Sequence, residues 1–177
     1  MVEIRWTGRG GQGVKTASLL LAGLGARAGL YVQGFPEYGP ERMGAPVTAY
    51  NRLSRRPIFI RGGIVSPHLA VALERESGRD LSLAPGGILL VNGGTGFSRD
   101  GFLTLSLPAA EISRRWLGRE FPGVCFSGAL FALLGLGVEG AEEFFRERFP
   151  REEVARGNYR AFRESYARVT KLLELDE

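Results

Sequence analysis

The sequence predicts an α/β protein, a three-layer Rossmann-like sandwich with a mostly parallel sheet and a helical C-terminal third. Short apolar runs alternate with segments of helical composition along the first two thirds of the chain. Two of these runs, Leu69–Leu73 and Ile88–Val91, are continuously apolar, as expected of strands buried on both faces of a sheet. From Val124 onward the periodicity is helical only. Interleaved strands and helices favour a parallel sheet, with the late helices packed over one face or edge.

Each element follows from local composition. Val2–Trp6 alternates and contains Ile and Trp, which predicts a strand, and the Ala/Leu-rich segment Val14–Ala28 predicts a helix that Gly29 closes. Pro36–Pro46 holds three prolines, which excludes a regular element. Further strands are expected at Leu30–Phe35, Val47–Leu53, Ile58–Ile60 as the hairpin partner of 47–53, Leu69–Leu73, Ile88–Val91 and Phe102–Leu105. Further helices are expected at Glu74–Leu83, Pro108–Leu117, Val124–Leu136, Glu142–Phe149 and Val154–Leu173.

Length and composition limit the classes of function. The 177 residues are most simply one domain, 1–177, and the net charge of +4 comes almost wholly from arginine. The basic clusters lack the interleaved aromatic residues that stack bases, so nucleic-acid binding is not expected. The single cysteine, Cys125, cannot by itself hold an iron–sulfur cluster, and the single histidine, His68, argues against a zinc site. Neither a leader nor an apolar run of membrane-spanning length is present, which predicts a cytoplasmic protein without membrane contact.

A glycine-rich stretch, Thr7–Thr16, joins the first strand to the first helix. Gly8, Gly10 and Gly13 fit the spacing of a dinucleotide-binding loop, and the free N–H groups at the helix start favour an anion. The acid expected at the end of the second strand is missing, because Glu37 falls in the proline-rich segment. The stretch has one residue too many before Lys15-Thr16 for a phosphate-binding P-loop. A tight turn that binds nothing remains an alternative.

The proline-rich segment follows the second strand and should lie at the same sheet edge as the glycine loop. Ligands of open α/β sheets bind beyond the carboxyl ends of the strands, so we expect the two segments to face one crevice. The segment's polar residues, Glu37, Tyr38, Glu41 and Arg42, are candidates for that crevice, and internal salt bridges that hold the loop are the alternative. The sequence contains no recognisable nucleophile with its base and no recognisable acid–base pair. We therefore predict that this chain carries no catalytic residue.

Together, Gly8-Arg9-Gly10-Gly11-Gln12-Gly13 and Phe35–Pro46 resemble the gamma subunit of 2-oxoacid:ferredoxin oxidoreductases. The similarity extends along the chain through Gly128-Ala129-Leu130 and Asn158 with Ala161, although Gly123 and Ser165 depart from the pattern. The resemblance implies a non-autonomous subunit of a complex that converts a 2-oxoacid and coenzyme A to acyl-CoA, carbon dioxide and reduced ferredoxin.

By the same resemblance, thiamine diphosphate, magnesium and iron–sulfur clusters belong to alpha, beta and ferredoxin-like delta partner subunits, with ferredoxin as the acceptor. Coenzyme A is the co-substrate, and no metal is expected on this chain. The residues expected to contact coenzyme A are Gly8, Gly10, Gly11, Gln12, Gly13 and Lys15, and those expected at the active-site mouth or subunit interface are Glu37, Tyr38, Glu41 and Arg42. Two alternatives are a stand-alone dinucleotide-binding module and the equivalent subunit of an indolepyruvate:ferredoxin oxidoreductase. The sequence does not specify the 2-oxoacid.

Overall fold

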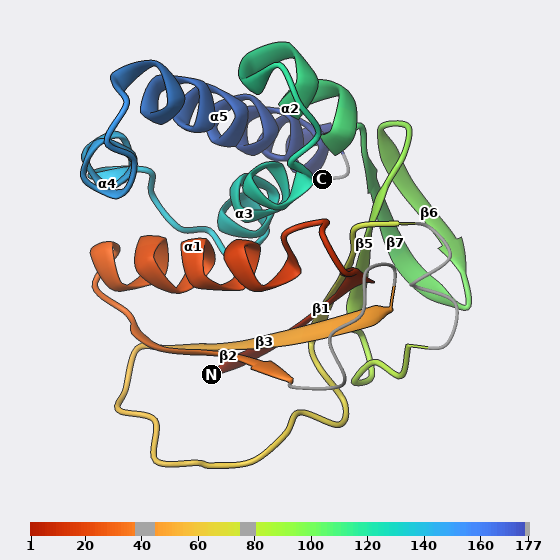
Figure 1. Ribbon diagram of the computed structural model, residues 1–177. Helices are drawn as coiled ribbons and strands as arrows, with labels where there is room; N and C mark the ends of the chain where they lie inside the picture. The colour runs from red at the N-terminus through yellow and green to blue at the C-terminus, as the bar shows by residue number, and fades with distance from the viewer. Residues whose placement is uncertain (38–44, 75–80, 176–177) are drawn as a thin grey trace.

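The computed structural model describes residues 1–37, 45–74 and 81–175. The strands of the described ranges all lie within the first 107 residues, and the helices other than α1 follow them (Figure 1). The strands are β1 Val2–Arg9, β2 Tyr31–Glu37, β3 Pro46–Ser54, β4 Leu69–Ala72, β5 Ile88–Asn92, β6 Gly96–Asp100 and β7 Phe102–Leu107. The helices are α1 Val14–Arg27, α2 Ala109–Leu117, α3 Pro122–Leu133, α4 Ala141–Arg148 and α5 Glu152–Leu175.

All seven strands form one sheet in the order β2-β3-β1-β4-β5-β7-β6. The four strands β1, β4, β5 and β7 pair in parallel, whereas β3 and β6 run against their neighbours. Because β2 pairs antiparallel with β3, it runs in the same direction as β1. The predicted α/β class, the mostly parallel sheet and the helical C-terminal third are therefore confirmed.

The helices gather on one face of this sheet (Figure 1). Helix α1 packs across β2 and β3, and α3 packs against α5 in the layer above. The close approach of α3 and α5 depends on Gly128, since a Cβ there would lie 2.2 Å from the carbonyl oxygen of Phe162. On the opposite face, a small apolar cluster of described residues covers β4 and β5, made of Ala70, Ala72, Leu81, Leu89, Val91 and Leu83. The helix-covered face thus holds the main core.

Three local predictions are wrong. Ile58–Ile60 is not a strand, and the pairing partners of β3 are β1 and β2. The proline-rich segment is strand at both ends, because β2 extends through Glu37 and β3 begins at Pro46. Strand β6 was not expected. The predicted helix at Glu74–Leu83 falls mostly on 75–80, outside the described residues. Among the helices of the described ranges, none has both the length and the apolar character needed to cross a bilayer.

Candidate functional site

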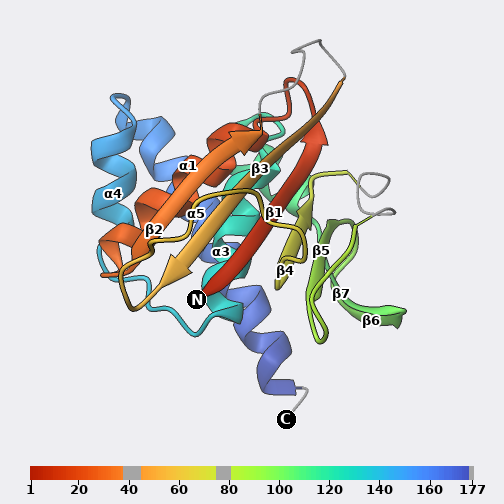
Figure 2. The same ribbon diagram turned by 90° about the horizontal axis from the view of Figure 1, so that it is seen from below.

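The glycine loop connects the carboxyl end of β1 to the first turn of α1 (Figure 2). Gly11 and Gly13 adopt left-handed backbone angles, with φ of 93° and 79°, which a residue with a side chain rarely adopts. Gly13 also occupies the N-cap of α1, and its carbonyl accepts the first helical hydrogen bond, from Ala17 N–H at 2.8 Å. The earlier N–H groups of α1 have no partner within the helix, so they point outward from its positive end.

Internal hydrogen bonds use part of the loop's backbone. Gly10 N–H donates to Ala45 O at 2.9 Å, and Gln12 N–H donates to Arg9 O at 3.1 Å. The side-chain oxygen of Gln12 accepts a hydrogen bond from Arg9 N–H at 2.7 Å. Among the described loop residues, Gly11 and Gly13 are the two glycines after β1 whose N–H groups have no such backbone acceptor. The loop therefore presents fewer amides to a ligand than its sequence offers.

The packing around each glycine shows which of them a ligand could approach. A Cβ on Gly8 would lie 2.8 Å from both Gln12 Oε1 and Val14 Cγ2, so Gly8 is required by tight packing beneath the loop. A Cβ on Gly13 would lie 2.6 Å from the ring of Phe121. Gly11 is exposed, and nothing lies within 4 Å of its Cβ position. Of the candidate glycines, Gly11 is the one that an anion can approach most directly.

Glu74 fixes the loop from the neighbouring strand, and sequence analysis did not identify it as a site residue. Its carboxylate binds Arg9 Nε at 2.8 Å and also accepts a hydrogen bond from Gln12 Nε2. Glu74 follows β4, which pairs in parallel with β1, so both strands deliver their ends to one edge. The sequence signal that could have identified Glu74 is a charged residue directly after the continuously apolar run of β4. Lys15 lies exposed in the first turn of α1.

One described flank of the proline-rich segment, Ala45 and Pro46, lies beside the glycine loop, and the other, Glu37, lies at the end of β2. Arg9 of β1 is opposite Pro46 of β3, next to the hydrogen bond between Gly10 and Ala45. Glu37 ends β2, and its carboxylate accepts a hydrogen bond from Tyr50 OH at 2.9 Å. Burial raises the pKa of Tyr50, and the hydrogen bond to Glu37 raises it further. The candidates Tyr38, Glu41 and Arg42 lie outside the described residues, so the shared crevice stays a prediction.

Strand order distinguishes this site from a dinucleotide fold. An acid does end the second strand, contrary to the sequence-based expectation, because β2 extends to Glu37. In a dinucleotide fold the second strand lies beside the first. Here antiparallel β3 lies between β1 and β2, and Glu37 is opposite Thr48, which is opposite Thr7. Two strand spacings, about 10 Å, therefore separate Glu37 from β1. This arrangement disfavours the recognition of an adenosine ribose.

The geometry thus offers a glycine loop braced by Glu74, and within residues 1–37, 45–74 and 81–175 no nucleophile with its base lies beside it. A family model described as pyruvate ferredoxin/flavodoxin oxidoreductase matches residues 3–168, which is nearly the whole chain. The chain belongs to this family. The resemblance drawn from the two motifs is thereby confirmed.

Relatives in the pyruvate ferredoxin/flavodoxin oxidoreductase family match along nearly their full length. The chain is 37% identical to the pyruvate synthase subunit PorC of Thermotoga maritima, with 94% of each chain covered. It is 35% identical to the pyruvate/ketoisovalerate oxidoreductases common subunit gamma of Pyrococcus furiosus, over 99% of this chain and 100% of that one. The crystal structure of the pyruvate oxidoreductase subunit PORC of Thermotoga maritima superimposes with a TM-score of 0.77 at 34% identity, covering 94% of this chain and 95% of that one.

Proposed function

We propose that this chain is the gamma subunit of a 2-oxoacid:ferredoxin oxidoreductase complex and acts only as part of it. The observation that carries the proposal is the match to separate subunits of such oxidoreductases over at least 94% of their length. The complex would oxidise a 2-oxoacid with coenzyme A, giving acyl-CoA and carbon dioxide and passing two electrons to ferredoxin. Pyruvate and branched-chain 2-oxoacids are the substrates that the names of the relatives favour. The expected cytoplasmic location stays a prediction.

The redox centres of this reaction fit poorly on this chain. Cys125 is completely buried in α3, its thiol lies 3.4 Å from Ala109 O, and burial raises its pKa to about 12. A thiol ligates metal as the thiolate, so Cys125 is unsuited to a cluster. We therefore assign iron–sulfur clusters to a ferredoxin-like delta subunit, and thiamine diphosphate with magnesium to alpha and beta subunits.

Coenzyme A fits the glycine loop better. Its phosphate groups are anions, and the amides of Gly11 and Gly13, together with the first turn of α1, would bind one of them. The exposure of Gly11 and its left-handed φ support direct contact, whereas Gly8, Gly10 and Gln12 support the loop from within. Lys15 adds positive charge in the first turn. Glu37, and with it Tyr38, Glu41 and Arg42, would border the mouth that faces the thiamine-bearing partner.

Reconstitution tests this function. The chain alone should not reduce ferredoxin, and adding it to the other purified subunits of its complex should restore coenzyme A-dependent reduction. Gly11→Val should raise the KM for coenzyme A about 5- to 30-fold, since the branched side chain blocks approach and the backbone strain makes the bound loop less favourable by about 1–2 kcal/mol.

Gly29→Val is the matched control. Gly29, at the other end of α1, has φ of 78° and, like Gly11, no atom within 4 Å of its Cβ position. It should lose similar stability and keep the wild-type KM. Full turnover without this chain would overturn the assignment as a subunit, and equal KM values for the two variants would exclude the loop as the coenzyme A contact.

A further inference from the structure

A second surface lies on the face of the sheet opposite the described helices. The segment 55–66, which connects β3 to β4, crosses beneath β2 and β3 (Figure 2). It carries three exposed arginines, Arg55, Arg56 and Arg61, and no aspartate or glutamate. None of the three forms a salt bridge with another described residue. Within the part of the chain that the structure describes, the segment is therefore a compact source of positive charge without a paired carboxylate.

The same segment exposes large apolar side chains. Phe59 is 88% exposed, Val65 is 83% exposed and Ile60 is 53% exposed. Clusters of exposed apolar residues on a small protein are typical of interaction surfaces. Arginine and aromatic residues are also enriched where proteins bind one another. The composition of the segment matches that of an interface better than that of an ordinary connecting loop.

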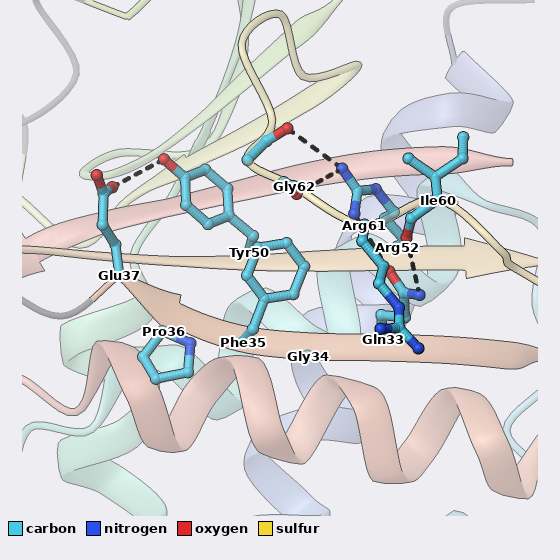
Figure 3. Close-up of a pocket in the computed structure, with 11 residues that line it drawn as sticks. Gln33, Gly34, Phe35, Pro36, Glu37, Tyr50, Arg52, Ile60, Arg61 and Gly62 are labelled. Atoms are coloured by element: carbon cyan, nitrogen blue, oxygen red, sulfur yellow. Dashed lines mark hydrogen bonds between the residues drawn. The ribbon is translucent and has the colours of Figure 1, made fainter.

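Hydrogen bonds from the sheet hold the segment in place (Figure 3). Arg52 Nη2 donates to Gly62 O at 3.0 Å and to Gly63 O at 3.3 Å, and Gln33 Nε2 donates to Ile60 O at 3.2 Å. The side chain of Arg52 is itself only 2% exposed and is paired with Glu3 at 2.8 Å. These contacts order the backbone while the side chain of Phe59 stays in solvent. Such preorganisation lowers the entropy cost of binding a partner.

A groove of about 580 Å³ separates the segment from the sheet. Phe35, Pro36 and Tyr50 line its floor, and the rings of Phe35 and Tyr50 lie 5.4 Å apart. Arg61 and Gly62 form part of the opposite wall. The exposed residue Ile60 also lines this groove, so a partner could insert an apolar side chain there, one position along the chain from Phe59.

We propose that segment 55–66 and this groove are the docking surface for another subunit of the same oxidoreductase complex, one that presents carboxylates around an apolar side chain. The proposal rests on the proposed function. Charge complementarity favours this occupant, because the carboxylates of an acidic partner would pair with the three exposed arginines. A second copy of the chain would place like charge against like charge, since a two-fold interface brings the same patch together. The glycine loop, at the carboxyl end of β1, stays free for its ligand.

The test immobilises the other purified subunits of the complex and measures the Kd of this chain for them over a range of salt concentrations. Arg55→Glu/Arg56→Glu should raise the Kd about 30-fold or more and flatten its salt dependence. Phe59→Ser should raise the Kd about tenfold or more without changing the salt dependence. Thermal unfolding should match the wild type for both variants, since these side chains are exposed.

Matched controls lie on α5 and just before it. Arg151→Glu/Arg163→Glu reverses the same number of exposed charges, and Leu175→Ser removes a side chain that is 75% exposed. Both controls should assemble like the wild type. If wild-type chain assembles and the segment variants bind equally well, the docking surface is refuted and the proposed function stands. If wild-type chain does not assemble, both are refuted. Variants that lose only self-association or only nucleic-acid binding would overturn the choice of occupant.

Discussion

The two faces of β1, β2 and β3 are formed by alternate residues of the same strands, yet different interactions stabilise them. Toward the helices, Ile4, Trp6 and Leu53 pack into the main core. Toward the other side, Glu3 and Arg52 form an ion pair beneath a connecting segment. One face is stabilised by apolar burial under α1, and the other by charged hydrogen bonds to backbone carbonyls. The first should resist local opening, and the second should permit it.

Two consecutive residues of β3, Asn51 and Arg52, lie on these two opposite faces. Asn51 faces the helices and is fully buried, where it accepts a hydrogen bond from Trp6 Nε1 at 2.7 Å and donates to Ser18 O at 2.9 Å. Arg52 faces the other way and holds the segment through Gly62 and Gly63. Because side chains alternate along a strand, substitutions at neighbouring positions affect opposite faces of the sheet. Substituting each in turn separates global stability from the order of the segment.

The largest effect is expected for Asn51→Ala. The substitution leaves the Trp6 indole N–H buried without an acceptor and opens a small cavity, which should cost about 3 kcal/mol of unfolding free energy. Urea denaturation monitored by tryptophan fluorescence measures the loss. Ser66→Ala, on the exposed segment, is a control that should change stability by less than about 0.5 kcal/mol. A loss below about 1 kcal/mol for Asn51→Ala would mean that the bond to Trp6 contributes little to the core.

Arg52→Met should lower the unfolding free energy less than Asn51→Ala does, but it should loosen the segment 55–66 more. Methionine keeps the aliphatic length but removes the donors to Gly62 and Gly63, and it leaves Glu3 without its partner. The global loss should be about 1–3 kcal/mol. Trypsin cleavage after Arg61 should accelerate about tenfold or more, because the segment opens without global unfolding. Asn51→Ala should leave that cleavage near the wild-type rate, and equal acceleration in both variants would contradict the separation of the two faces.

Local signals in the sequence predicted the parts of this fold that depend on neighbouring residues. The spacing of Gly8, Gly10 and Gly13 identified the loop after the first strand, because strand, turn and helix are contiguous there. The continuous apolar run at Leu69–Leu73 predicted a fully buried strand for the same reason. The family resemblance also depended on two contiguous motifs.

Residues whose role depends on distant partners were missed. Glu74 braces the glycine loop only because β4 pairs with β1, and its partner Gln12 is 62 positions away. Ile58–Ile60 has the composition of a strand, but Arg52 and Gln33 hold this region as a connecting segment instead. The exposure of Phe59 likewise could not be foreseen from an apolar run. Such features follow from tertiary hydrogen bonds that local periodicity does not encode.

The smallest effect is expected for Tyr50→Phe, which tests the polar face by pH. Burial raises the pKa of Tyr50 above its ordinary 10.0, the hydrogen bond to Glu37 raises it further, and the positive charge of Arg5 opposes both. Above about pH 10 an unfolded tyrosine releases its proton while the folded one retains it. The stability that Tyr50 contributes is therefore complete below that pH and is lost as the pH rises.

Tyr50→Phe should lose about 1 kcal/mol at neutral pH, since one hydrogen bond disappears, and its stability should decline less between about pH 9 and about pH 11 than that of the wild type. Urea denaturation at a series of pH values measures both. Tyr31→Phe is a control, because Tyr31 lies on the neighbouring strand β2 and is 50% exposed, so its alkaline decline should match that of the wild type. A parallel decline in wild type and Tyr50→Phe would show that the hydroxyl at the groove is not held by Glu37, and that this face is looser than its hydrogen bonds indicate.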